Sequence, residues 1–501
     1  MSNLRDRTLS GLKWSGATQA VAQVIQFGVS IVIARLLNPA DFGLMAMIVV
    51  MTGFAASIAD LGLGTSIVQK QDITDQQLQT VFWLVGGLGA ALCAMFALAA
   101  PLVAQFYREP QLRSVTVAVA STFVVVSLAV VPNALLQRDL NFRARFQIEA
   151  SAIGISGIAA MALAFAGAGV WSLVAQVIAL AVTRTGITYM CSSWRPRIDF
   201  DGGSIKELVA FGRSIVGFNV VGYWAQNFDK LIVGRVLGGE ALGVYRLADK
   251  LMRMPLDNVT HMTTSVMFPA MSALGDEIAA LKRVYLRGNR MIALVTFPLM
   301  LGLGVLAEPA ILGVYGEKWR GAIAMVEVLC LAGLAQSVYN TAAWIFLSRK
   351  RPDILFRLGI ISAVVRISGV LIGMHWGLLG IAIAYTVGGY IGVMFPTWIA
   401  AGRLVDLHLG ELLRNVAAPF CCALAMAVAL GIADRCLLST HAPWLRLVVL
   451  VPFGVAVYGT LIRAMNLQAW TEVRDMALDM GGRRSRLVQW VVGTNSASRS
   501  R

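Results

Sequence analysis

The chain has 501 residues, of which 57% are hydrophobic and 14% charged, and its formal net charge is +15. A soluble domain carries about 25% charged residues, so the composition excludes an ordinary soluble protein and predicts an all-α polytopic membrane protein. The six cysteines show no metal-ligand spacing, and no nucleotide-binding motif occurs, so we expect no metal and no cofactor.

The apolar stretches predict the number of membrane spans. A helix that crosses the bilayer needs about 20 mostly apolar residues. About fourteen such stretches occur, at residues 13–36, 42–66, 79–104, 114–136, 149–167, 170–190, 208–236, 241–273, 291–315, 323–347, 356–374, 376–400, 414–434 and 444–464. The first is too long for the apolar part of a cleaved signal peptide, so we expect it to remain in the protein.

The distribution of Lys and Arg predicts the orientation. If the N-terminus is cytoplasmic, 27 of the 42 basic residues fall in cytoplasmic segments, eight in outer segments and seven in or beside spans. Cytoplasmic loops are enriched in Lys and Arg. We therefore expect both termini in the cytoplasm, and the positive net charge to reflect these loops rather than nucleic-acid binding.

The two halves of the chain resemble each other at an offset of 200 residues. Residues 31–37 with Gly43 correspond to residues 231–237 with Gly243. Six spans lie in each half, and because six is even the halves should run parallel, related by an axis along the membrane normal. The expected domains are an N-terminal lobe, a cytoplasmic linker, a C-terminal lobe, two additional spans and a cytoplasmic tail, at 1–190, 191–207, 208–400, 401–465 and 466–501.

Charged residues within the span at 241–273 mark a candidate substrate site. Arg246, Lys250, Arg253 and Asp257 fall on one helical face, and Asp249 lies within a turn of both arginines. A charge at the centre of a lipid-exposed helix costs about 2.5–3.5 kcal/mol, so this face should meet protein or water. A cationic lining for an anionic substrate and a purely structural ladder of ion pairs both fit the pattern.

Other polar residues in spans extend the candidate site. Lys230 and Arg366 are further candidate cations for the substrate. Each has a structural alternative: Lys230 in an ion pair across the hairpin of the spans at 208–236 and 241–273, and Arg366 in pairing with Glu327. Gln23 belongs to a glutamine stripe that could bind sugar hydroxyls or join helices. The candidate ion-coupling residues are Asp60, Asp229, Asp249 and Asp257.

Three motifs carry a resemblance to a known family. Residues 34–43, 134–138 and 227–238 resemble the polysaccharide transport family of bacterial flippases, with Wzx-type exopolysaccharide exporters as the most similar members. The resemblance implies a MATE-like two-lobe fold within the multidrug/oligosaccharidyl-lipid/polysaccharide superfamily. It also implies that the protein flips an undecaprenyl-diphosphate-linked repeat unit across the bacterial inner membrane and is not an enzyme. The partners expected are this lipid-linked oligosaccharide, membrane lipids, a polysaccharide polymerase and a chain-length regulator.

Three alternatives remain at this point. A multidrug–cation antiporter of the same fold would favour an acidic cavity, which Lys250, Arg253 and Arg366 oppose. A lipid II flippase would also have a cationic cavity. A membrane polymerase usually needs a sizeable outer loop, and the outer segments here are short.

Overall fold

The computed structural model describes residues 25–59, 73–139, 141–199, 202–274 and 277–465, together with Gln23, Gly64 and Ile67. Throughout these ranges the secondary structure is helical, and no strand occurs in them. The prediction of an all-α protein is therefore confirmed. The helices belong to two compact units, Met1–Gly243 (unit 1) and Val244–Arg501 (unit 2).

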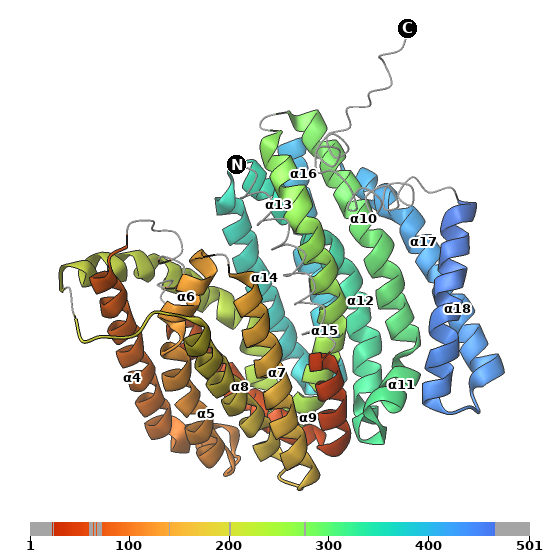
Figure 1. Ribbon diagram of the computed structural model, residues 1–501. Helices are drawn as coiled ribbons and strands as arrows, with labels where there is room; N and C mark the ends of the chain where they lie inside the picture. The colour runs from red at the N-terminus through yellow and green to blue at the C-terminus, as the bar shows by residue number, and fades with distance from the viewer. Residues whose placement is uncertain are drawn as a thin grey trace. The chain divides into compact units, whose positions relative to one another are not determined.

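Unit 1 contains the first helices of the chain (Figure 1). They are Ile25–Leu36, α2 (Pro39–Ala59), α4 (Asp75–Tyr107), α5 (Leu112–Ser127), α6 (Val130–Arg138), α7 (Phe142–Phe165), α8 (Val170–Cys191) and the first part of α9 (Gly202–Ala273). Helix α4 packs on α5, and α7 packs on α8. The start of α4 is fixed by a capping box in which Thr74 accepts from the backbone N–H of Gln77 at 3.2 Å.

Unit 2 contains the rest of α9 and the helices that follow. They are α10 (Ile278–Val305), α11 (Ala307–Ala310), η1 (Ile311–Tyr315), η2 (Glu317–Ala322), α12 (Ile323–Tyr339), α13 (Ala342–Ser348), α14 (Pro352–Gly373), η3 (Met374–Trp376), α15 (Gly377–Gly388), η4 (Gly389–Met394), α16 (Phe395–Val405), α17 (Leu409–Ala433), η5 (Asp434–Leu438) and α18 (Pro443–Ala464). Helix α10 packs on α12 and α17, and α14 packs on α15.

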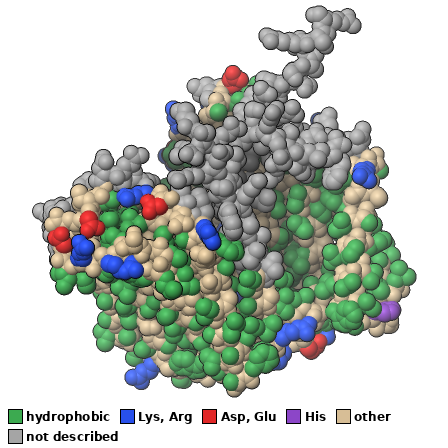
Figure 2. Space-filling model, viewed as in Figure 1, with side chains coloured by type: hydrophobic (Ala, Val, Ile, Leu, Met, Phe, Trp, Pro, Cys, Tyr) green, Lys and Arg blue, Asp and Glu red, His purple; other side chains and the backbone are tan. Residues whose placement is uncertain are grey.

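The helices have the length and apolarity of membrane spans. Eight of the described stretches meet both conditions, or nine if α5 and α6, which bend by 45°, form one span. One of the eight, Pro352–Val405, is 54 residues long and includes both spans expected at 356–374 and 376–400. Hydrophobic side chains cover much of the face that Figure 2 shows. The chain is a multi-pass membrane protein, while the number fourteen stays a prediction.

A glycine breaks α9 between the spans predicted at 208–236 and 241–273. Gly238 has φ 88° and ψ −178°, which interrupts the helix between its two halves. A positive φ of this size is favourable for glycine alone, because other side chains clash with the backbone there. The helix resumes after this turn, as the sequence predicts, and it carries the charged face of Arg246 to Asp257.

Close backbone contacts within unit 1 explain why the repeated glycines correspond. A Cβ atom at Gly43 would lie 1.7 Å from the carbonyl oxygen of Gly239, and one at Gly243 would lie 1.9 Å from that of Pro39. The offset of 200 that relates Gly43 to Gly243 also relates Pro39 to Gly239. Each contact is therefore the repeat-related copy of the other, as at a two-fold axis. Only glycine at 43 and 243 permits this approach.

We expect Gly243→Ala to destabilise the protein, because the added methyl group must displace the backbone of Pro39. Overpacking of this kind typically costs about 1–3 kcal/mol. Gly87→Ala in α4 is the matched control, since a Cβ there has no neighbour within 4 Å. The thermal unfolding midpoint in detergent should fall for Gly243→Ala and stay near that of the unaltered protein for Gly87→Ala. Equal midpoints for the two variants would contradict the close contact.

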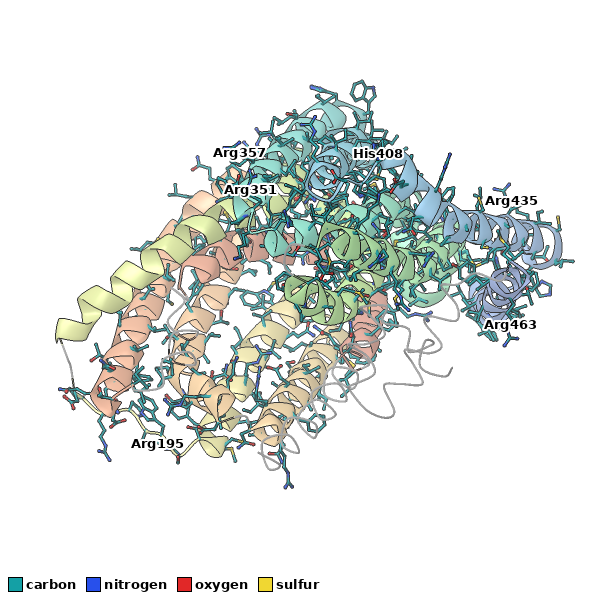
Figure 3. The ribbon with its side chains drawn as sticks, turned by 90° about the horizontal axis from the view of Figure 1, so that it is seen from above. Arg195, Arg351, Arg357, His408, Arg435 and Arg463 are labelled. Carbon is teal, nitrogen blue, oxygen red and sulfur yellow. The ribbon has the colours of Figure 1, made fainter. Side chains whose placement is uncertain are left out.

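The segment between α8 and α9 is fastened to α4. The buried amide of Gln79 accepts from the N–H of Arg197 at 2.6 Å and donates to the carbonyl of Arg195 at 3.2 Å. The indole N–H of Trp83 donates to the Arg197 carbonyl at 2.9 Å. Arg195 lies on this thin segment at the edge of the unit 1 helices (Figure 3). The Gln79 side chain therefore satisfies one backbone donor and one backbone acceptor of this segment.

Candidate functional site

A chain of polar contacts begins at α9 in unit 2. The Nε atom of Arg253 donates to the Oδ1 atom of Asp249 at 2.7 Å, one helical turn away. The Nη2 atom of the same guanidinium donates to the hydroxyl of Tyr385, on α15, at 3.3 Å. Asp249 is only 7% exposed. Arg253 is thus bonded both to an acid on its own helix and to a phenol on another span.

The contacts continue to Arg366 on α14. Its Nη2 atom donates to the hydroxyl of Tyr339, on α12, at 3.2 Å. Its Cζ atom lies 5.5 Å from the centroid of the Tyr385 ring, within the range of a cation–π interaction. Among the described side chains Arg366 has no ion pair, and the alternative pairing with Glu327 does not form there. Neutral phenols therefore surround this cation.

The packing around α15 supports the placement of Tyr385. The hydroxyl of the adjacent Thr386 donates to the carbonyl of Val328, on α12, at 3.2 Å. On the other side, Gly388 allows α14 to approach, since a Cβ there would lie 2.9 Å from a methyl group of Val365. Val365 precedes Arg366. These contacts bring the phenol of α15 and the guanidinium of α14 together.

The cluster of Asp249, Arg253, Arg366, Tyr339 and Tyr385, here called the arginine cluster, has an excess of positive charge. Within the cluster, the Asp249 carboxylate and the Arg253 guanidinium form one ion pair. The second guanidinium, of Arg366, contacts only phenols. Uncompensated charge in a low-dielectric surrounding is costly. An anion would remove this cost, and guanidinium groups match the oxygens of phosphate or carboxylate well.

The other predicted residues of unit 2 share helix α9. Arg246 is half-buried, whereas Lys250 and Asp257 are exposed. Lys250 lies one turn from both Arg246 and Arg253, so the helix places three cations on successive turns. The structure gives these residues the periodicity that the sequence predicts. Their part in substrate binding or ion coupling stays a prediction.

The remaining predicted residues belong to unit 1 or lie outside the described residues. Asp229 is 9% exposed, and Lys230 donates to the carbonyl of Gln226 at 3.1 Å and to the side chain of Asn227 at 3.2 Å. Gln23 is half-buried. The predicted coupling residue Asp60 lies outside the described residues.

Sequence reasoning missed the two tyrosines of the arginine cluster. Tyr339 and Tyr385 lie within the spans predicted at 323–347 and 376–400, and a buried tyrosine usually needs a partner for its hydroxyl. The sequence could therefore have indicated that both hydroxyls need partners. It could not have identified them, because Arg366 is 27 residues from Tyr339 and Arg253 is 132 from Tyr385.

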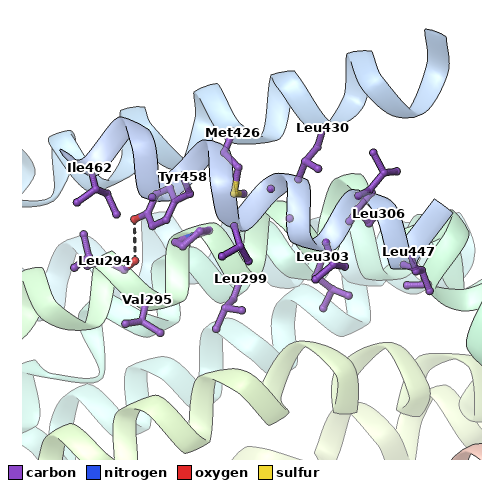
Figure 4. Close-up of a pocket in the computed structure, with 18 residues that line it drawn as sticks. Leu294, Val295, Leu299, Leu303, Leu306, Met426, Leu430, Leu447, Tyr458 and Ile462 are labelled. Carbon is purple, nitrogen blue, oxygen red and sulfur yellow. Dashed lines mark hydrogen bonds between the residues drawn. The ribbon is translucent and has the colours of Figure 1, made fainter. Parts of the chain in front are cut away.

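Unit 2 also has an apolar groove of about 560 Å³ between α10, α17 and α18 (Figure 4). Its walls include Leu299, Leu303, Met426, Leu430 and Leu450. No Lys, Arg, Asp or Glu occurs among its lining residues, all of which are described. The groove therefore suits an aliphatic chain rather than a polar ligand.

Polar contacts hold the helices at the two ends of this groove. At one end the hydroxyl of Tyr458 donates to the carbonyl of Leu294 at 2.8 Å (Figure 4). Near the other, buried Arg446 forms a bidentate pair with Asp434, at 2.7 and 2.5 Å, and a contact with Glu308 at 3.2 Å. These bonds fasten α18 to α10, α11 and η5, and they therefore hold the walls of the groove in place.

Comparison with protein families now identifies the chain. A family model described as polysaccharide biosynthesis protein matches residues 32–324. The chain belongs to this family. Lipopolysaccharide biosynthesis protein WzxC of Escherichia coli (strain K12) is 27% identical over 423 residues, covering 82% of this chain and 84% of that protein. Succinoglycan biosynthesis transport protein ExoT of Rhizobium meliloti (strain 1021) is 26% identical over 394 residues, covering 76% and 79%. The predicted family resemblance is confirmed.

Solved structures confirm the fold. Lipid II flippase MurJ in its inward closed conformation aligns with a TM-score of 0.73 at 13% identity, covering 91% of this chain and 100% of that chain. An inward-facing multidrug resistance transporter of the MATE family aligns at 0.58 and 16% identity, covering 76% and 95%. The fold is MATE-like, as predicted. ExoT is named a transport protein, which agrees with the prediction of a transporter rather than an enzyme.

Variants of Arg253 and Asp249 should distinguish a substrate-binding role of Arg253 from a purely structural one. If Arg253 contacts the substrate, both Arg253→Ala and the double variant with Asp249→Ala should abolish or severely reduce polysaccharide export while protein still reaches the membrane. If the pair only supports packing, the double variant should recover export, because no unpaired charge remains. Export is measured as secreted polymer, and membrane abundance by immunoblot. Normal export by the double variant would exclude the substrate role.

Proposed function

We propose that the protein flips an undecaprenyl-diphosphate-linked oligosaccharide from the inner to the outer leaflet of the bacterial inner membrane. The flipped unit would supply the synthesis of exopolysaccharide, capsule or lipopolysaccharide. One observation carries the proposal: within unit 2, membrane-spanning helices hold an arginine cluster with excess positive charge, and the same unit has an apolar groove. Such a substrate has an anionic head and a long aliphatic tail.

The diphosphate would be held by cations. Charge-assisted hydrogen bonds are about twice as strong as neutral ones, and they are strongest where water is excluded. Arg253 and Arg366 would contact the phosphates, and Arg246, Lys250 and Lys230 would attract the anion along its route. Gln23 would offer an amide to the sugar hydroxyls. Binding must stay modest overall, since a transporter also has to release its substrate.

The groove would guide the polyprenyl tail rather than provide the affinity. Moving an aliphatic chain from lipid into a protein groove gives little hydrophobic gain, because both surroundings are apolar. Selection for this substrate must then depend on the head group. The absence of Lys, Arg, Asp and Glu from the lining of the groove agrees with this division of roles.

Translocation would proceed by alternating access of two lobes, at about 1–190 and 208–400, that are related by the sequence repeat. The two additional spans at 401–465 would stand outside this repeat. Asp60, Asp229, Asp249 and Asp257 are the proposed ion-coupling residues. Of these, Asp249 is paired with Arg253, so arrival of the anion at Arg253 would change the surroundings of this carboxylate directly.

The proposal includes a location and partners. Both termini would be cytoplasmic, as the excess of Lys and Arg in the alternate segments indicates. A flipped repeat unit must next be joined to others, so a polysaccharide polymerase and a chain-length regulator would act on the product at the outer face. The same fold serves cation transporters, but an arginine cluster with excess positive charge opposes a cationic substrate.

Loss of the protein should leave its substrate in the inner leaflet. In a deletion strain we expect the lipid-linked oligosaccharide to accumulate, and to be protected from an impermeant oxidant of sugars added to spheroplasts. Re-expression of the protein should restore exposure and polymer. Accumulated repeat units exposed to the oxidant without chain growth would instead indicate a polymerase, and accumulation of lipid II alone would indicate a lipid II flippase.

Filling the groove should impair transport without disturbing the fold. Gly459 lines the groove, and a Cβ atom added there has no neighbour within 4 Å. Gly459→Phe should therefore occupy the path of the tail and reduce export several-fold. Gly87→Phe in α4, which also has open space, is the control and should export normally. Equal export by the two variants at equal membrane abundance would exclude the groove from the substrate path.

A further inference from the structure

We infer that Tyr385 is a positioning residue that holds Arg253 and Arg366 as a paired site for the two phosphate groups of a diphosphate. The inference deepens the proposed function and rests on it. Tyr385 connects the two arginines: its hydroxyl accepts from Arg253 at 3.3 Å, and its ring lies under Arg366 at 5.5 Å. No other described side chain has recorded contacts with both guanidinium groups.

The two contacts use different parts of the phenol. The hydroxyl oxygen is an acceptor at the end of the ring, whereas the ring face attracts a cation through its quadrupole. Arg253 is therefore placed at the end of the side chain, and Arg366 beside its face. The phenol is itself held, because it is 9% exposed and the adjacent Thr386 is bonded to α12.

Charge explains why this arrangement needs a ligand. Two guanidinium groups in one apolar neighbourhood repel each other, and Asp249 is bonded to only one of them. A neutral phenol can orient both cations without neutralising either. A diphosphate can place one phosphate at each guanidinium, whereas a monophosphate has a single group to share between them. The pair therefore favours the diphosphate.

Tyr339 provides a second, independent variant. Its hydroxyl accepts from Arg366 at 3.2 Å and has no recorded contact with Arg253. Removing it should release Arg366 in part and leave Arg253 in place. Tyr390, five residues after Tyr385, is a matched control, since its hydroxyl donates to the Leu331 carbonyl at 2.9 Å and has no recorded contact with an arginine.

The experiment measures binding of farnesyl diphosphate and farnesyl monophosphate to the purified full-length protein in detergent, by titration calorimetry. The Phe variants remove one hydroxyl each and leave every ring in place. For Tyr385→Phe we expect the Kd of the diphosphate to rise about tenfold, which equals about 1.4 kcal/mol, with a smaller rise for the monophosphate. Tyr339→Phe should weaken diphosphate binding in the same direction. Tyr390→Phe should bind both probes as the unaltered protein does.

The outcomes distinguish the inference from the function it rests on. Failure of the unaltered protein to bind either phosphate would overturn the proposed function. Binding by the unaltered protein that is unchanged in Tyr385→Phe would overturn this inference alone. A purely structural tyrosine would lower the thermal unfolding midpoint and weaken both probes equally, which would also overturn it.

Discussion

A guanidinium inside an apolar span must find partners on neighbouring helices, and the organisation of unit 2 follows from that requirement. An isolated charge in such surroundings costs several kcal/mol. Arg253 meets the carboxylate of Asp249, but Arg366 meets only the phenols of Tyr339 and Tyr385. Four membrane helices, α9, α12, α14 and α15, therefore converge on two cations and one acid. The compensation is incomplete, and this excess positive charge is the reason for proposing an anionic head group as the substrate.

In the proposed function, apolar and polar parts of unit 2 divide the recognition of a lipid-linked anion between them. The groove between α10, α17 and α18 offers a path without charge, yet it cannot select its occupant, since lipid is equally apolar. We therefore propose that selection comes from the arginine cluster. The ion pairs at Arg446 serve a different purpose: they match one cation with two acids and join helices at the end of the groove. Excess positive charge is thus confined to one of these two arginine sites.

The sequence predicted the features that depend on local pattern. Helical periodicity placed Arg246, Lys250 and Arg253 on one helix, and the predicted spans at 208–236 and 241–273 lie on either side of the break at Gly238. The repeat predicted that Gly43 and Gly243 correspond, but their mutual approach to Gly239 and Pro39 depends on the packing of distant helices. Tyr339 and Tyr385 were missed for the same reason, as was the fastening of residues 195–197 by Gln79. From the sequence alone one can infer that a buried polar group needs a hydrogen-bond partner. Which residue provides it depends on how the helices pack.

Translocation by the purified protein tests the central claim most directly. Liposomes would carry a fluorescent undecaprenyl-diphosphate oligosaccharide in the outer leaflet, together with either the unaltered protein or Arg366→Gln, which removes the charge but keeps hydrogen-bond donors. Protection from an impermeant quencher reports movement to the inner leaflet. We predict that the unaltered protein protects the lipid and that Arg366→Gln, reconstituted to the same density, does not. Equal rates for the two proteins would contradict the claim that this uncompensated cation recognises the diphosphate.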